Sequence, residues 1–219
     1  MTEQDWLASD DPAAMLAWLT HPASEREHLC LDAPSDRKLR LFACACCRIM
    51  DDEWTKDPVD LWEETGHPLC KDPLRWAANW TSGDPETHAG QIPAATRAAL
   101  LRDIFGNPWQ PAKMHPNYYD YCVRRGAIEA IARTIYDSRD FAAMPILADA
   151  LEEAGCSDED ILRHCRGFEP CIDETHQRGG GAYWCPQCGG TEEGTEGWMK
   201  LRGAHVRGCW VLDLLLGKE

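Results

Sequence analysis

Apolar residues recur at helical spacing along most of the chain, and this pattern predicts amphipathic helices. From Leu39 to Cys46, apolar side chains occupy positions i, i+3, i+4 and i+7. The same spacing marks apolar positions within 93–105, 128–135, 147–154 and 161–165. No alternating pattern of useful length predicts a strand. We therefore expect an all-α fold, with the helices arranged as a bundle.

Capping and turn-forming residues indicate where several of these helices begin and end. Asp11 and Pro12 predict a helix start, because an acidic cap precedes proline in the first turn. Gly106 and Gly155 follow two of the apolar segments and predict helix ends. The final segment, Cys209 to Leu216, is apolar except for one aspartate, which predicts a buried helix central to the fold.

Cysteine and histidine are concentrated between His164 and Trp210, and this stretch predicts a metal site. A tight turn can present the two thiolates of a Cys-x2-Cys pair to one tetrahedral ion, and a structural zinc site takes four such ligands. The loop 168–204 that contains the pair is glycine-rich, and a bound metal would stabilise it. We expect the zinc ligands to be Cys171, His176, Cys185 and Cys188.

Two other interpretations of this stretch stay open. His205 and Cys209 could supply the second ligand pair in place of Cys171 and His176, which gives a stretched zinc-finger spacing. Alternatively, the Cys-x2-Cys thiols are free in a disordered loop, because a segment with few apolar residues gains little from ordering. The predicted organisation is a helical domain at 1–167, an inserted zinc-binding loop at 168–204 and a C-terminal helix at 205–219 that completes the helical domain.

A second group of cysteines lies at Cys44, Cys46 and Cys47, within one predicted helix. The spacing of Cys44 and Cys47 would suit a metal or a redox pair. No histidine or third ligand is evident nearby, so we interpret these residues as small buried thiols where helices approach closely.

The acidic composition restricts the partners that the chain can bind. Its 37 Asp and Glu outnumber 22 Lys and Arg, which gives a formal net charge of −15. This charge opposes binding to phosphate backbones and anionic membranes. The polar, acidic first residues do not resemble a signal peptide, and no apolar run approaches the length of a membrane span. We expect a cytoplasmic protein whose cysteines are reduced thiols or metal ligands.

Four long blocks of the sequence form a recognisable set: LRLFACACCR at 39–48, LLRDIFGNP at 100–108, ILADALEEAGC at 146–156 and HVRGCWVLDLLLG at 205–217. Together these blocks resemble a large paralogous group of uncharacterised proteins from planctomycete bacteria. The third is also similar to the short repeat-companion domain of the same bacteria. The resemblance implies no catalytic residues.

The same resemblance marks residues 168–204 as an insertion. In the family, a block like the one that starts at His164 runs almost directly into the block at His205, whereas here the loop intervenes. This departure favours a loop with its own ligands. It also suggests a separate site in the parent fold at His164, Cys165, His205 and Cys209, although these residues could simply pack and cap two helix ends.

The chain lacks the common signatures of catalysis, so we expect a non-enzymatic interaction or regulatory protein with a structural zinc site and a protein partner. It has no Gly-x4-Gly-Lys, no His-Glu-x2-His and no Gly-x-Ser-x-Gly. One alternative is a metal-dependent hydrolase, with Glu169, Asp173 or Glu174 as acid or base. Another is a thiol redox protein that uses one of the two Cys-x2-Cys pairs.

We predict no appreciable affinity for duplex DNA at physiological salt. The net charge of −15 must be overcome before any phosphate contact contributes to binding. A gel-shift titration at micromolar protein, repeated at several salt concentrations, measures this. A salt-sensitive shift would contradict the prediction.

Overall fold

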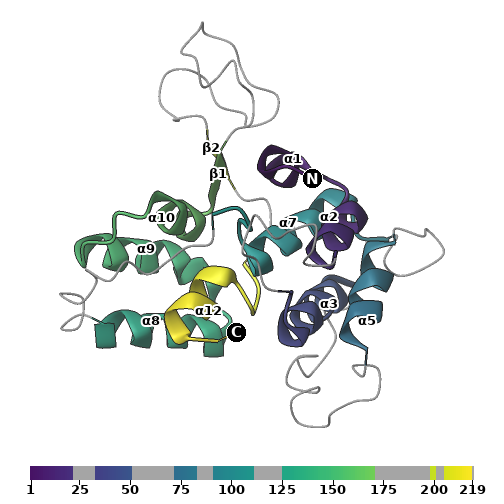
Figure 1. The fold of residues 1–219 in the computed structure, drawn as a ribbon. Coiled ribbons are helices and arrows are strands. Elements are labelled where there is room, and N and C mark those ends of the chain that lie inside the picture. The colour runs from purple at the N-terminus through teal and green to yellow at the C-terminus, as the bar shows by residue number, and fades with distance from the viewer. Residues whose placement is uncertain are drawn as a thin grey trace, which may run out of the picture. The chain divides into compact units, whose positions relative to one another are not determined.

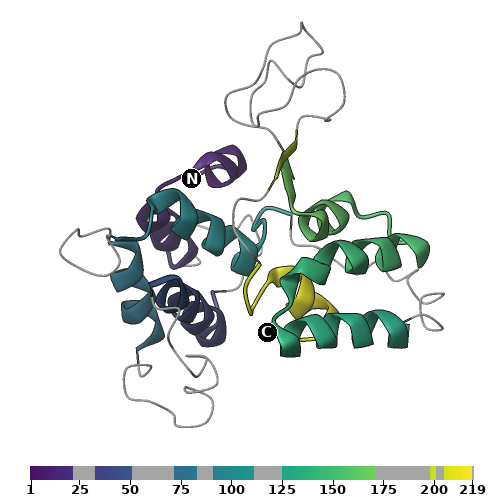
Figure 2. The same ribbon diagram turned by 180° about the vertical axis from the view of Figure 1, so that it is seen from behind.

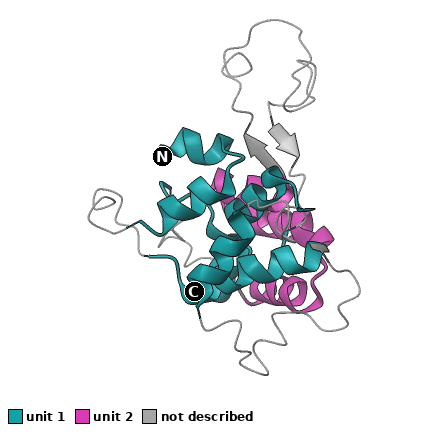
Figure 3. Cartoon of the chain, turned by 90° about the vertical axis from the view of Figure 1, so that its right-hand side faces the viewer, with its two compact units in different colours: residues 1–111, 205–219 teal, residues 112–204 magenta. Residues whose placement is uncertain are grey.

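The computed structural model describes residues 1–21, 33–50, 72–82, 91–110, 125–170, 198–200 and 205–218. By its internal contacts the chain divides into two compact units, coloured separately in Figure 3. Unit 1 comprises Met1–Pro111 and His205–Glu219, and unit 2 comprises Ala112–Ala204. The end of the chain therefore belongs with its first half, and the intervening residues form a unit of their own.

The described helices of unit 1 are α1 (Glu3–Ala8), α2 (Pro12–Leu19), α3 (Asp36–Met50), α5 (Pro73–Thr81), α7 (Ala94–Phe105) and α12 (Trp210–Leu216). Among them, α1, α2 and α5 begin at residues whose side chains cap them. At α1, Thr2 and Asp5 form a capping box, and the hydrogen bonds from Thr2 hold the pKa of the Asp5 carboxyl below its usual value. At α2, Asp11 Oδ1 accepts hydrogen bonds from the amides of Ala13 and Ala14.

The core of unit 1 forms where α3 packs against α5 and α7, and where α2 packs against α7 (Figure 1). The predicted apolar face of α3 is confirmed, because Leu39, Phe42 and Cys46 are all buried. From α1, the fully buried Trp6 donates a hydrogen bond through Nε1 to the carbonyl of Gly106, at 3.1 Å. The end of α7 is thereby fixed to the first helix of the chain.

The C-terminal helix is buried at positions 211–213, as its composition predicts, whereas Trp210 and residues 214–216 are half-buried. Val211 and Leu212 are inaccessible to solvent, and so, nearly, is Asp213. The Asp213 carboxylate receives two hydrogen bonds from the guanidinium of Arg37 on α3, at 2.7 and 3.0 Å. A charge as deeply buried as Asp213 requires such a partner.

The described residues of unit 2 form three α-helices, a 3-10 turn and a short β-ribbon. They are α8 (Arg125–Ser138), the 3-10 turn η5 (Phe141–Ala143), α9 (Met144–Glu153), α10 (Glu159–Arg166), β1 (Phe168–Pro170) and β2 (Trp198–Lys200). Helix α9 packs against both α8 and α10, and Figure 2 shows this set from behind. Its interior includes the predicted positions Ile128, Ile135, Leu147 and Leu151.

The predicted all-α class is confirmed, and the arrangement of the helices as one bundle stays a prediction. The sequence did not reveal the antiparallel pairing of β1 with β2, because three residues are too few to establish an alternating pattern. Residues 171–197 and 201–204 of the predicted insertion lie outside the described residues, so its boundaries also stay a prediction. No helix among the described residues is long and apolar enough to cross a bilayer.

We predict that Asp213→Asn lowers the free energy of unfolding by about 2–4 kcal/mol, because the substitution leaves a largely buried guanidinium without its carboxylate. The matched control is Glu129→Gln, which removes the exposed Arg133–Glu129 pair on α8 and should cost less than about 0.5 kcal/mol. Chemical denaturation followed by circular dichroism measures both. Equal effects of the two substitutions would contradict the prediction.

Candidate metal centre

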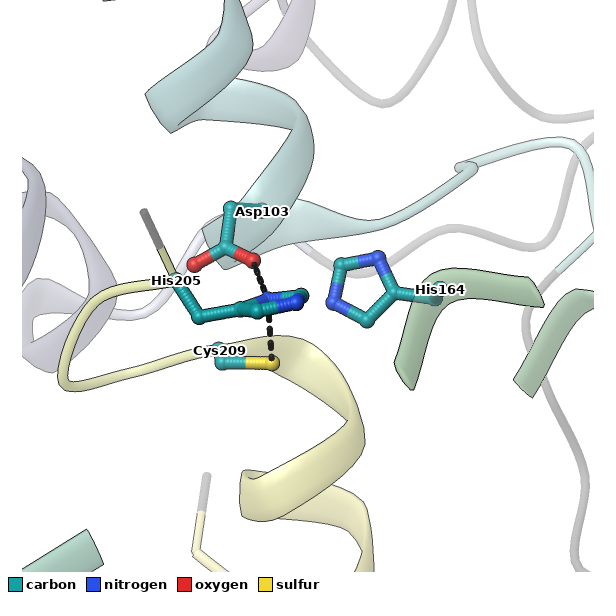
Figure 4. A group of neighbouring side chains, drawn as sticks. All are labelled: Asp103, His164, His205 and Cys209. Atoms are coloured by element: carbon teal, nitrogen blue, oxygen red, sulfur yellow. Dashed lines mark hydrogen bonds and ion pairs between the residues drawn. The ribbon is translucent and has the colours of Figure 1, made fainter. Parts of the chain in front are cut away.

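Three potential metal-ligand side chains meet in unit 1, between the end of α7 and the start of α12. They are Asp103, His205 and Cys209, and their ligand atoms lie within 4.8 Å of one another. Figure 4 shows the Asp103 carboxylate above the His205 ring and the Cys209 sulfur below it. All three are buried, with 5%, 8% and 0% of their surface exposed. This combination of oxygen, nitrogen and sulfur donors could hold a metal ion.

Asp103 is positioned by the end of α7. It lies in the last turn of the helix, between the buried Leu101 and Ile104. Gly106 ends the helix at a φ of 68°, and a Cβ there would lie only 3.1 Å from the Trp210 ring. Glycine therefore satisfies both the backbone conformation and the close approach of α12. The carboxylate of Asp103 is held where the C-terminal segment returns to unit 1.

His205 and the backbone that follows it bind the same carboxylate. His205 Nδ1 lies 2.7 Å from Asp103 Oδ1, and the Val206 amide donates to Asp103 Oδ2 at 2.9 Å. Each oxygen of Asp103 thus has its own partner. The imidazole ring is fixed relative to the chain that carries it, because both contacts are with one rigid group.

A tight turn places Cys209 beside His205. The Cys209 amide donates to the carbonyl of Val206 at 2.9 Å, and Cys209 Sγ lies 3.9 Å from His205 Nδ1. Gly208 adopts a φ of 98°, and a Cβ at this position would lie 2.7 Å from Leu41 Cδ1 of α3. Only glycine permits this turn to approach α3 so closely. The turn that starts α12 therefore brings together His205 and Cys209, which are four residues apart in sequence.

The contact with Asp103 orients His205 as a metal ligand. An ionised carboxylate can only accept a hydrogen bond, so this contact suits the tautomer in which Nδ1 donates to Asp103 and Nε2 is the nitrogen available to a metal. Histidine residues that bind metals commonly donate their other ring N–H to a carboxylate in this way. Asp103 has two possible roles here, as a direct ligand or as the group that orients His205.

Two pairs of residues were considered as partners of the Cys-x2-Cys thiols, and the structure describes one of these pairs. His205 and Cys209 lie together, as the alternative assignment requires. Cys171, His176, Cys185 and Cys188 lie outside the described residues, as do Asp173 and Glu174, and of Glu169 only the backbone, in β1, is described. Of the residues proposed for a separate site in the parent fold, Cys165 is fully buried and His164 is half-buried, both on α10. Figure 4 also draws His164, a residue of unit 2, which stays a sequence-based candidate for a further ligand.

Asp103 was not predicted as a ligand from the sequence. The available signal was an acidic residue among Leu100, Leu101, Ile104 and Phe105, in a helix whose apolar positions predict burial. A buried carboxylate needs a partner, but its partner here is 102 positions away along the chain. Spacing rules for metal ligands apply to neighbouring residues, so they could not find it.

The cysteines of α3 are core residues, as interpreted from the sequence. Cys44 and Cys46 are buried and Cys47 is half-buried. Burial raises the pKa of the Cys46 thiol, which keeps it protonated and unreactive. Among the described residues, the centre at Asp103 is the one cluster of at least three metal-ligand side chains.

Comparisons of the chain with family models, with curated proteins and with solved structures gave no match. The similarity to the planctomycete group therefore stays a prediction, and the chemistry of the centre carries the functional argument.

We predict that Cys46 reacts with iodoacetamide on the order of 100-fold more slowly in the native protein than in guanidinium, because the helix must open before the reagent reaches it. Mass spectrometry of the peptide that contains residues 44–47 measures the rate. Cys47, half-buried on the same helix, is the internal control and should react faster. Native and denatured rates of equal size at Cys46 would contradict the prediction.

Proposed function

We propose that the chain is a non-enzymatic, cytoplasmic interaction or regulatory protein with a structural zinc site in unit 1. The proposed site consists of His205 and Cys209, with Asp103 as a third ligand or as the group that orients the histidine. The observation that carries this proposal is the buried contact of one carboxylate with both the ring and the backbone of the histidine segment. A carboxylate that orients a metal-binding histidine in this way is typical of metal sites.

The donor set favours zinc over the other common divalent ions. Calcium and magnesium prefer sites made of oxygen atoms, whereas thiolate and imidazole together suit zinc. In a reducing compartment the Cys209 thiol would be available as a thiolate ligand. A zinc ion would also compensate for burying the negative charge of Asp103.

The burial of all three side chains favours a structural role over catalysis. A catalytic zinc keeps one position open to water or substrate, whereas a structural zinc is closed by protein ligands. Side chains that are 8% exposed or less offer little access to a substrate. A metal-dependent hydrolase stays the second candidate, and a bound water seen by X-ray absorption spectroscopy would favour it.

Asp103, His205 and Cys209 are at most three ligands, and a closed site needs a fourth. His164 is our proposed addition, because the resemblance to the planctomycete group brings the His164–Cys165 block next to the His205–Cys209 block in sequence. Cys165 is fully buried, whereas the adjacent His164 is half-buried. Adjacent positions on a helix face different directions, so both cannot serve one ion.

We further propose that Cys171, His176, Cys185 and Cys188 bind a second zinc ion in the loop. Zinc bound at the two sites would make the surface that binds a protein partner rigid. The net charge of −15 favours a partner with a basic surface, because complementary charge accelerates association.

We predict about two zinc ions per chain, one at each site. Cys209→Ser should remove about one, because it eliminates the thiolate of the unit 1 site, and a Cys185→Ser, Cys188→Ser double variant should remove the other. Elemental analysis of protein purified without a metal-affinity tag measures the content. Cys156→Ser, at a buried cysteine outside both sites, is the control.

The outcomes separate the two sites and their ligands. Undiminished zinc in Cys209→Ser would refute the site in unit 1, and undiminished zinc in the double variant would refute the site in the loop. His164→Ala should weaken zinc binding in a chelator competition if this histidine completes the first site. Equal affinity in His164→Ala and the wild type would remove it from the ligand set.

A further inference from the structure

The C-terminal segment, residues 205–216, belongs to unit 1 although it is separated from the rest of that unit in sequence. Unit 1 contains residues up to Pro111 and resumes only at His205, after the whole of unit 2. The segment therefore depends on its own contacts for its attachment. Attachment of the segment to unit 1, which we call docking, closes a long loop of the chain. The contacts of the segment must offset the entropy cost of that closure.

Three groups of contacts attach the segment to α3 and α7. At its start, Asp103 binds His205 and the amide of Val206. In the turn, Gly208 packs against Leu41. Within the helix, Asp213 pairs with Arg37, and the Trp210 ring lies against Gly106 at the end of α7. Two of the three groups involve buried charge, whose net contribution to stability is smaller than its direct attraction.

The proposed zinc site spans the junction that docking creates. Asp103 belongs to α7, whereas His205 and Cys209 belong to the segment. When the segment is undocked, the ligands are separated and the site does not exist. By linkage, an ion that binds only the docked form stabilises it, by about 2.7 kcal/mol at a free concentration 100 times the dissociation constant.

We infer that zinc regulates the docking of the C-terminal segment, so that metal binding and attachment of α12 to unit 1 are one coupled equilibrium. Loss of zinc releases the segment and exposes the apolar residues that it covers, Leu41 among them. The inference rests on the proposed zinc site in unit 1 and adds a consequence that zinc binding alone does not require.

Hydrogen exchange of the full chain, followed by mass spectrometry, tests the inference. The protein is compared as purified, after chelation, and after chelation followed by zinc. We expect chelation to accelerate exchange in the α12 peptide by about 10- to 100-fold, the range that corresponds to a zinc contribution of roughly 1.4–2.7 kcal/mol, and zinc to reverse it. Peptides from α8 and α9 serve as an internal reference and should not change.

Two variants separate metal binding from docking. Cys209→Ser should exchange rapidly in α12 with or without zinc. Arg37→Gln leaves the proposed ligands intact and weakens only the Asp213 contact, so its α12 should exchange faster than the wild type in both states and still be slowed by zinc. If zinc slows exchange of the α12 peptide in Arg37→Gln but not in Cys209→Ser, the result supports coupling through the metal.

The zinc content of each sample is measured in parallel. Zinc bound to unit 1 without any change in α12 exchange on chelation would overturn the inference and leave the proposed function standing. Absence of zinc from the unit 1 site would overturn both. Faster exchange in all helices after chelation would show that the metal supports the whole fold. This result would overturn specific control of the C-terminal segment.

Discussion

The buried carboxylate of Asp103 is the constraint on which the return of the chain to unit 1 depends. Its two oxygens are divided between the His205 ring and the Val206 amide, so it fixes both the side chain and the backbone. Without these partners the carboxylate would be buried and unsatisfied, at a cost of several kcal/mol. This cost strongly favours one register, that is, one alignment of the returning segment with α7. A shift of the segment by one residue would move both the His205 ring and the Val206 amide away from the Asp103 carboxylate.

The remaining contacts of the segment follow from that register. The turn after His205 brings Gly208 against Leu41, where no larger residue fits. One further turn of helix places Asp213 opposite Arg37, and the Trp210 ring lies against Gly106 at the end of α7. Apolar burial is non-directional, so it distinguishes poorly between one register of the segment and another. The polar pairs provide the discrimination, since each is costly when unpaired.

Local features of the fold could be predicted from the sequence, whereas the pairing of distant residues could not. Helical periodicity identified the buried face of α3 at Leu39, Phe42 and Cys46, because neighbours in sequence determine which side of a helix is apolar. His205 and Cys209 were named only as the alternative to Cys171 and His176, because the latter lie in the same loop as the Cys-x2-Cys pair. Asp103 was missed entirely, since its role depends on a residue 102 positions away. The pairing of β1 with β2 is equally remote in sequence.

The contrast between Cys46 and Cys209 explains why residue type alone does not identify the centre. Both thiols are fully buried in unit 1. Around Cys46 the environment is apolar enough to raise the pKa of its thiol, which favours the neutral form and makes it a poor metal ligand. Cys209 instead lies within 3.9 Å of a histidine nitrogen that is itself held by a carboxylate. The same side chain is part of the core in one place and a potential ligand in the other, and the neighbouring polar groups decide between the two.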